Sequence, residues 1–494
     1  MLDKLQNPEL FSAEFGQIQL SEDTGLLHRF GVMLYDEFQR TNNKCDMNKG
    51  LWGIEQAVQQ IATNKINYGT YIGDTGLALL RQFKVSRKLP DIDKAISMME
   101  GAVACAAKDN VNLPTLLDTL GNFFLLHFEC TGNVTDIASA ISTLQTTVQL
   151  TPEGHENMPS RLNNLGISFV TRFERTGDLA DIASAISTQQ RAVQLTPEEH
   201  KDMPSFLSNL GISFSIQFER TSDFADIAIA ISTQQRAVQL TPKGHIDMPA
   251  LLNGLGNFFL TQFKQTSDLA DIASAISTFQ SAVQLTPEGH EDMPSRLNNL
   301  GISFATRFER TGDLADIASA ISTQQRAVQL TPEEHKDMPS FLSNLGNSFA
   351  RQFERTGDLS DIASAISTQQ RAVQLTPKGH VDMPALLNGL GNFFLTQFKQ
   401  TSDLADITSA ISTFQSAVQL TPEGHEDMSS RLNNLGNSFA RQFERTGDLS
   451  DILNRLVILQ ILQVLSPLSR ELSSSLQRGI KTCPQGSTTL ETPF

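Results

Sequence analysis

A glycine recurs every 45 residues along this chain, and no other feature constrains the fold as strongly. The ten glycines are Gly31, Gly76, Gly121, Gly166, Gly211, Gly256, Gly301, Gly346, Gly391 and Gly436. A fixed period of roughly 20 to 50 residues is typical of repeat arrays, in which each small unit buries its apolar face by stacking on its neighbours. The sequence therefore predicts one elongated array of about ten units, with its function on the surface.

One unit, residues 159–203, has the pattern of two helices. A first helix over residues 159–176 carries one apolar stripe, made of Leu162, Leu165, Gly166, Phe169 and Phe173. Asp178 and Asp181 favour the start of a second helix, because carboxylates stabilise the exposed amides of a helix N-terminus. Thr196 and Pro197 end it. With no strand-like alternation between them, the fold class is predicted to be all-α, an array of antiparallel helix pairs.

Gly166 lies in the middle of the first helix, where glycine costs about 1 kcal/mol relative to alanine. Because this cost recurs in every unit, we expect a steric reason. A glycine without a Cβ would let the second helix approach the first unusually closely.

The unit resembles a tetratricopeptide repeat (TPR), whose pattern is W-x₂-L-G-x₂-Y, then A-x₃-F, then P. The first block matches at Leu162, Leu165, Gly166 and Phe169, and the second at Ala185, Ala192 and Pro197, with Gln189 in place of the aromatic residue. The period is 45 rather than 34 residues. This length is similar to long fungal TPR-like units and, more loosely, to kinesin light chain repeats. The resemblance implies an α-α superhelix, a TPR-like solenoid.

The repeat pattern divides the chain into three parts. Residues 1–23 are expected to form a degenerate cap or half-repeat, 24–452 the array, and 453–494 a divergent last helix with a disordered tail. A truncated or frameshifted coding sequence would give the same C-terminal pattern. Within the array, residues 160–294 and 295–429 are two blocks of three units that differ at 11 positions.

Charge and composition narrow the class of partner. The net charge of −16 disfavours nucleic acid, because such a surface repels phosphate backbones. No stretch has the apolar character of a signal peptide or a membrane span, so no membrane partner is expected. Cys45, Cys105, Cys130 and Cys483 lack paired or metal-like spacing. We therefore expect a cytoplasmic protein.

Histidine and methionine form a ladder with the same period. Its members are His155, His200, His245, His290, His335, His380 and His425, each followed three residues later by Met158, Met203, Met248, Met293, Met338, Met383 or Met428. Adjacent units are about 10 Å apart, which is too far for two of these side chains to share an ion. We expect no metal site. Histidine is predicted to bond the backbone of the neighbouring loop, and methionine to fill the seam between the paired helices.

The chain lacks a nucleophile elbow, a phosphate-binding loop and an HExxH motif. Glu174 and Arg175 are interpreted as a solvated, mutually compensated pair. No catalytic residue and no cofactor are therefore expected, and the protein is predicted not to be an enzyme.

The TPR resemblance implies a protein-binding groove along the first helix of each unit. Carried over position by position, its residues are Asn163, Ile167, Val170, Thr171, Ser208, Ile212, Ser215, Ile216, Asn253, Asn257, Leu260, Thr261, Asn298, Ile302, Asn347, Arg351, Asn388, Asn392, Leu395, Asn433, Asn437 and Arg441. Asparagine can both donate to and accept from a peptide backbone, which suits an extended peptide or a helix from a partner protein. Four of the 11 differences between the blocks fall in this row, at 170/305, 212/347, 215/350 and 216/351.

Three functions remain open at this point. The leading hypothesis is a non-enzymatic scaffold for protein-protein interaction. The resemblance also allows the sensor half of a signalling receptor, because the fungal arrays often accompany an NTPase or a CHAT peptidase-like domain, neither of which is visible here. A third hypothesis is a cargo adaptor like kinesin light chain.

Overall fold

The computed structural model describes residues 31–34, 68–106, 112–448, 450 and 453–454 of the 494-residue chain. The chain divides into two compact units, Met1–His245 and Ile246–Phe494. The predicted cap at residues 1–23 and nearly all of the predicted segment at 453–494 lie outside the described residues. The three-part division of the chain stays a prediction.

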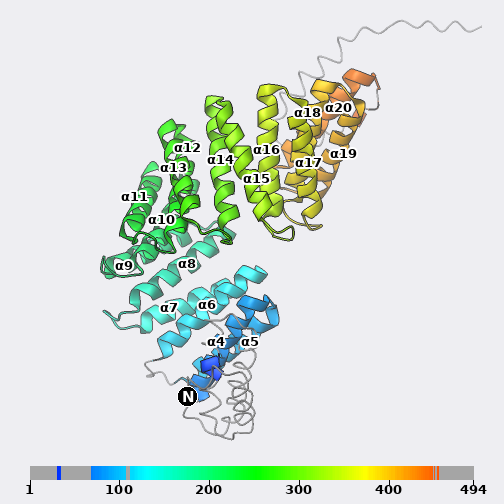
Figure 1. The fold of residues 1–494 in the computed structure, drawn as a ribbon. Helices are drawn as coiled ribbons and strands as arrows, with labels where there is room; N and C mark the ends of the chain where they lie inside the picture. Colours follow the sequence, from blue (N-terminus) through cyan, green and yellow to red (C-terminus); the bar gives the residue numbers. More distant parts are fainter. Residues whose placement is uncertain (1–30, 35–67, 107–111, 449, 451–452, 455–494) are drawn as a thin grey trace, which may run out of the picture. The chain divides into compact units, whose positions relative to one another are not determined.

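All regular elements of the described residues are α-helices, and no strand occurs among them (Figure 1). Unit 1 contains α4 (Tyr68–Ser86), α5 (Leu89–Cys105), α6 (Leu113–Thr131), α7 (Val134–Leu150), α8 (Met158–Thr176), α9 (Leu179–Leu195), α10 (Met203–Thr221) and α11 (Phe224–Leu240). Unit 2 contains α12 (Met248–Thr266), α13 (Leu269–Leu285), α14 (Met293–Thr311), α15 (Leu314–Leu330), α16 (Met338–Thr356), α17 (Leu359–Leu375), α18 (Met383–Thr401), α19 (Leu404–Leu420) and α20 (Met428–Thr446).

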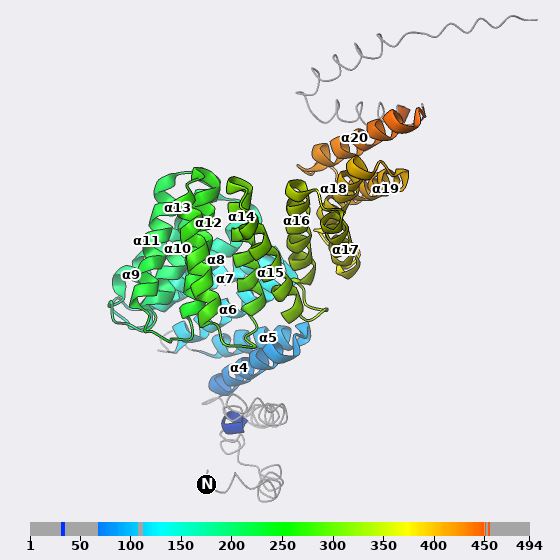
Figure 2. The same cartoon turned by 45° about the horizontal axis from the view of Figure 1, so that its top comes forward.

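In both units the helices form consecutive pairs. Each even-numbered helix, called helix A below, is followed by an odd-numbered helix B that runs back alongside it (Figures 1 and 2). Each helix B also packs against the next helix A of the same unit. The predicted fold class, an all-α TPR-like array of antiparallel helix pairs, is confirmed.

The boundaries of α8 and α9 follow from local chemistry. Pro159 lies in the first turn of α8, where no backbone N–H is needed, and Gly177 ends the helix with a φ of 70°. The side chain of Asp178 accepts a hydrogen bond from the N–H of Ala180 and caps α9. The predicted turn between the two helices is therefore confirmed.

The apolar core is shared between neighbouring repeats. In unit 2, Ile272, Ala275 and Phe279 of α13 are 0% exposed and belong to one cluster with Phe263 of α12 and Leu300 of α14. Each helix B thus fills the space between two A helices, which gives the array its continuity.

The glycine in the middle of helix A makes room for a large side chain of helix B. A Cβ atom at Gly256 would lie 2.7 Å from the ring of Phe279, and one at Gly166 would lie 2.5 Å from Cγ of Gln189. The expected steric reason for the glycine is therefore confirmed, because a side chain of helix B fills the space of the missing Cβ. The unusually close approach of the two helices stays a prediction.

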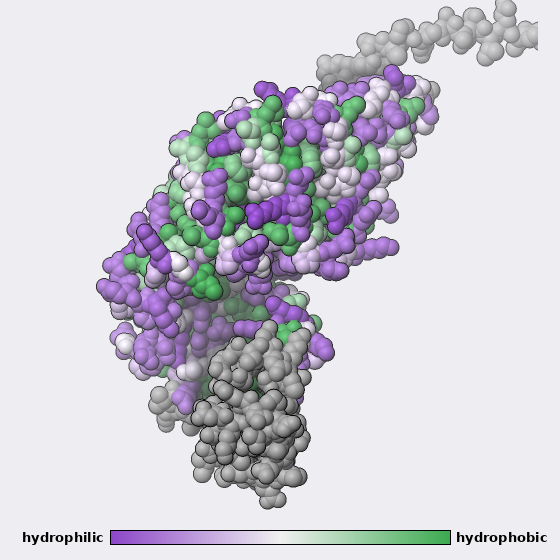
Figure 3. All heavy atoms as spheres, in the orientation of Figure 1, coloured by the Kyte–Doolittle hydropathy of each residue, from purple (hydrophilic) through white to green (hydrophobic). Residues whose placement is uncertain are grey.

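The surface mixes hydrophilic and hydrophobic residues, as the visible face in Figure 3 shows. Part of its apolar area comes from the first residue of helix B, such as Leu314 and Leu359, each 50% exposed. Within the described residues, no helix combines the length and the apolar character that crossing a membrane requires.

Candidate functional site

Several asparagines predicted to line the groove are hydrogen-bonded between repeats. Oδ1 of Asn298 accepts a hydrogen bond of 3.1 Å from Nδ2 of Asn344 on the next helix A. Equivalent bonds join Asn163 to Asn209 at 3.0 Å, and join Asn253 to Asn299 and Asn388 to Asn434 at 3.1 Å. These amides stabilise the stacking of repeats, a role that the position-by-position transfer did not predict.

The residues predicted to line the groove differ in how exposed they are to solvent. Ser215, Leu260 and Leu395 are buried, as are Asn163 and Asn298. Partly buried residues are Ile167, Val170, Thr171, Ser208, Ile216, Asn253, Thr261, Ile302, Asn347, Arg351 and Asn388, and exposed residues are Ile212, Asn257, Asn392, Asn433, Asn437 and Arg441. The accessible residues, partly buried and exposed, are called the helix-A surface below.

The four asparagine-to-asparagine bonds between repeats are called the asparagine ladder below. We expect that removing one of them changes the stability of the array rather than its binding. Replacing Asn298 with alanine is expected to lower the free energy of unfolding by about 1 kcal/mol, because Nδ2 of Asn344 loses its acceptor. Urea denaturation followed by circular dichroism measures this change. Asn257→Ala is the matched control, since Asn257 is exposed and no described residue bonds its side chain. Equal losses in both variants would contradict the role of the ladder.

A cavity of about 460 Å³ lies on the helix-A surface of unit 2. Its lining comes from three successive A helices, α14, α16 and α18, and the turn after α14; Figure 2 labels these helices. Its lining consists of Phe308, Glu309, Gly312, Asn347, Ala350, Arg351, Glu354, Arg355 and Phe393. The structure thus brings two predicted groove residues, Asn347 and Arg351, together in one hollow.

The cavity combines paired and unpaired polar groups. Nη2 of Arg351 lies 2.5 Å from Oε1 of Glu309 on the neighbouring helix A. Asn347, Glu354 and Arg355 line the cavity and make no side-chain hydrogen bond or ion pair with the rest of the described chain. Polar groups beside an apolar wall, here Phe308, Ala350 and Phe393, are typical of a binding site.

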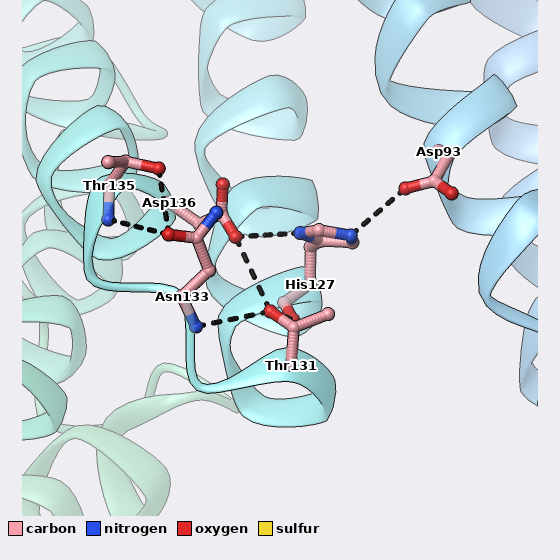
Figure 4. A network of polar contacts seen from close by, with 6 residues as sticks. All are labelled: Asp93, His127, Thr131, Asn133, Thr135 and Asp136. Carbon is pink, nitrogen blue, oxygen red and sulfur yellow. Dashed lines mark hydrogen bonds and ion pairs between the residues drawn. The ribbon is translucent and has the colours of Figure 1, made fainter.

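A polar network that the sequence did not predict surrounds His127 of α6 (Figure 4). Its Nδ1 lies 2.7 Å from Oδ2 of Asp136 on α7, and its Nε2 lies 3.0 Å from Oδ1 of Asp93 on α5. The side chain of Asn133 caps α7 by accepting a hydrogen bond from the N–H of Thr135. Because both ring nitrogens have partners within the chain, His127 links three helices instead of offering a free ligand.

The loop histidines bond within their own loops. Nδ1 of His200 accepts a hydrogen bond of 3.2 Å from the N–H of Asp202, and five of the other loops repeat this contact. The predicted bond to the neighbouring loop is therefore wrong for these histidines, because the tight turn places the N–H two residues further on beside the ring.

In three repeats the methionine lies in the seam between paired helices, as predicted: Met158, Met293 and Met338 each contact an alanine of the paired helix B. Met158 is 4% exposed and packs with Leu162 of α8 and Ala192 of α9. Among the residues that the structure describes, no three His, Cys, Asp or Glu side chains are close enough together to hold a metal ion.

Comparison with known proteins adds information about the fold. No protein-family model and no curated protein matches the chain. Two solved structures of monomeric IFIT1 mutants, one with m7Gppp-AAAA and the other with Gppp-AAAA, are similar at 14% identity, with TM-scores of 0.51 and 0.52. The first covers 92% of this chain and 91% of IFIT1, and the second 93% and 91%. At this identity the similarity concerns the fold alone.

The solved neighbours include TPR-repeat proteins. The C-terminal part of a TPR repeat-containing protein from Cytophaga hutchinsonii is 13% identical, covering 64% of this chain and 99% of its own, with a TM-score of 0.40. A kinesin light chain-like protein of Podosopora anserina with nearly identical TPR-like repeats is 12% identical, covering 43% and 97%, with a TM-score of 0.33. Both scores are too low to support inference from these two proteins.

Proposed function

We propose that this protein is a non-enzymatic scaffold whose helix-A surface binds extended or helical segments of partner proteins. The observation that carries the proposal is the cavity between α14, α16 and α18, where Asn347 and Arg355 remain without partners in the described chain. An amide and a guanidinium beside aromatic rings suit the mixed polar and apolar groups of a peptide.

Capped RNA, with which IFIT1 was solved, fits this chain less well. The net charge is −16, and the cavity lining contains two glutamates as well as its two arginines, so it has no excess of positive charge. RNA binding depends on an excess of positive charge, which releases counterions from the phosphates. The charge pattern therefore favours a protein partner.

Cross-linking of partners captured from a host extract tests the proposal. We expect cross-links to map to the A helices, and the double variant Asn347→Ala/Arg355→Ala to reduce capture at the cavity about tenfold, as for residues that dominate an interface. The helical circular dichroism signal should stay unchanged, because neither side chain has a partner in the described chain.

Arg326→Ala provides the matched control. Arg326 is an exposed arginine on a helix B, α15, and does not line the cavity. Cross-links confined to the B helices, or equal losses in the control and the double variant, would contradict binding at the cavity. Capture of RNA in place of protein would contradict the partner class.

A further inference from the structure

The two nearly identical blocks differ at the site itself. Ile212, Ser215 and Ile216 of α10 correspond to Asn347, Ala350 and Arg351 of α16, which line the cavity. The other cavity-lining residues of α14 and α16 are Phe308, Glu309, Glu354 and Arg355, and they have identical counterparts in Phe173, Glu174, Glu219 and Arg220. The two pairs of A helices, α8 with α10 and α14 with α16, therefore share four of these residues but differ in three side chains.

The exchange of Arg351 for Ile216 leaves the carboxylate of Glu174 without the counter-charge that Glu309 has. In unit 2, Glu309 pairs with Arg351 at 2.5 Å. In unit 1, its counterpart Glu174 has Ile216 at the position of that arginine. Within the described chain no ion pair involves Glu174, and both Glu174 and Arg175 are exposed, so their mutual compensation without direct contact stays a prediction.

The carboxylate of Glu174 has no counter-charge bonded to it in the described chain. Although Glu174 is exposed, partial desolvation by its surroundings raises the pKa of its carboxyl above its usual value. The nearby Arg220 instead lies over the ring of Phe173, with its Cζ 5.7 Å from the ring centroid. A cation brought by a ligand would restore the interaction that Glu309 has within the chain.

Aliphatic side chains accompany the carboxylate. Ile212 is 42% exposed, and Ile216 is partly buried one turn further along α10. An arginine matches this combination, because its methylene stem packs on apolar surface while its guanidinium binds a carboxylate. Arg351 and Glu309 make such an ion pair between the equivalent helices α16 and α14.

We propose that the surface formed by α8 and α10 binds a protein segment that carries an arginine beside an aliphatic residue. The guanidinium contacts Glu174 as Arg351 contacts Glu309, and the aliphatic residue packs on Ile212 and Ile216. The corresponding site of unit 2 does not select such a segment, because Arg351 already occupies the carboxylate. This inference rests on the proposed binding role of the helix-A surface, and the net charge of −16 attracts basic segments.

Fluorescence anisotropy with labelled peptides tests the site on the full chain. The probe carries one arginine between two leucines, and its partner probe carries citrulline, which has the same shape without the charge. We expect the arginine peptide to bind about fivefold more tightly, as an exposed ion pair allows. Ile216→Arg should abolish this preference, because it supplies Glu174 with the arginine found in unit 2.

The reverse exchange in unit 2 provides a gain-of-function control. Asn347→Ile/Arg351→Ile should create a second arginine-selective site and raise the stoichiometry from one to two peptides per chain. Equal binding of the two peptides, or an unchanged preference in Ile216→Arg, would overturn the proposal. So would the absence of arginine-peptide binding at about 1 mM.

The outcome separates this inference from the proposed function. If partner cross-links map to the A helices while arginine and citrulline peptides bind alike, the scaffold function stands and the arginine site is wrong. If cross-links avoid the A helices and neither peptide binds, both are wrong.

Discussion

Replacing Gly256 with alanine is expected to lower the free energy of unfolding of unit 2 by about 2 kcal/mol. The new Cβ would lie 2.7 to 2.9 Å from three atoms of the Phe279 ring, which is 0% exposed and packs in the core cluster with Phe263 and Leu300. Either α12 moves away from α13 or the ring leaves its rotamer, and overpacking of this kind costs about 1–3 kcal/mol. With three ring atoms this close, we expect the upper end of that range, about 3 kcal/mol, which exceeds the helix propensity of about 1 kcal/mol that alanine gains over glycine and leaves a net loss of about 2 kcal/mol.

Hydrogen exchange of amides in α12 and α13 measures this effect where it occurs. The matched control is Gly101→Ala in α5, where a Cβ would meet Ile72 at an ordinary 3.7 Å. That variant should be stabilised by about 0.5–1 kcal/mol, because only the propensity term changes. A destabilised control, or an unaffected Gly256→Ala, would show that glycine is present for another reason.

The helices were predictable because their signals are local. The apolar stripe from Leu162 to Phe173, Pro159 in the first turn and the cap Asp178 all act within about one helix length, so sequence spacing specifies them. The mid-helix glycine was also interpretable, because its cost in helix propensity required a compensating contact.

The asparagine ladder was not predicted, because its bonds join residues 46 positions apart, one more than the period. A signal was nevertheless present in the sequence. Asn344, whose amide donates, lies 46 residues after Asn298, whose amide accepts. In the next repeat the equivalent two positions are Gly389, which has no side chain to donate, and Ser343. Comparing each unit with the next, shifted by one residue, would have found this pairing.

The counter-charge of Glu309 was missed for the same reason. Glu309 and Arg310 repeat the Glu174 and Arg175 that were interpreted as mutually compensated, but the arginine bonded to Glu309 is Arg351 on the next helix A. Adjacent residues on a helix point in different directions, whereas side chains on neighbouring helices can meet directly. The contacts that distinguish the two blocks are therefore contacts between repeats.

Removing the carboxylate of Asp316 is expected to lower the free energy of unfolding by about 1–3 kcal/mol. Asp316, in the first turn of α15, accepts two hydrogen bonds from Arg307 of α14, at 2.8 Å from Nε and 2.5 Å from Nη2. Its side chain is 6% exposed, and that of Arg307 is 31% exposed. Asp316→Ala leaves the guanidinium without its partner, while water at the exposed part of Arg307 keeps the loss below that of a fully buried pair.

The array contains its own control for this ion pair. In the next repeat, Gln352 occupies the position of Arg307 and its Nε2 donates to Oδ1 of Asp361 at 3.3 Å. Arg307→Gln should therefore keep a hydrogen bond to Asp316 and cost less than about 1 kcal/mol in urea denaturation. If Arg307→Gln costs as much as Asp316→Ala, the charge of the arginine is essential. If both are neutral, the bond does not stabilise the turn, and the start of α15 depends on its cap at Asp313 instead.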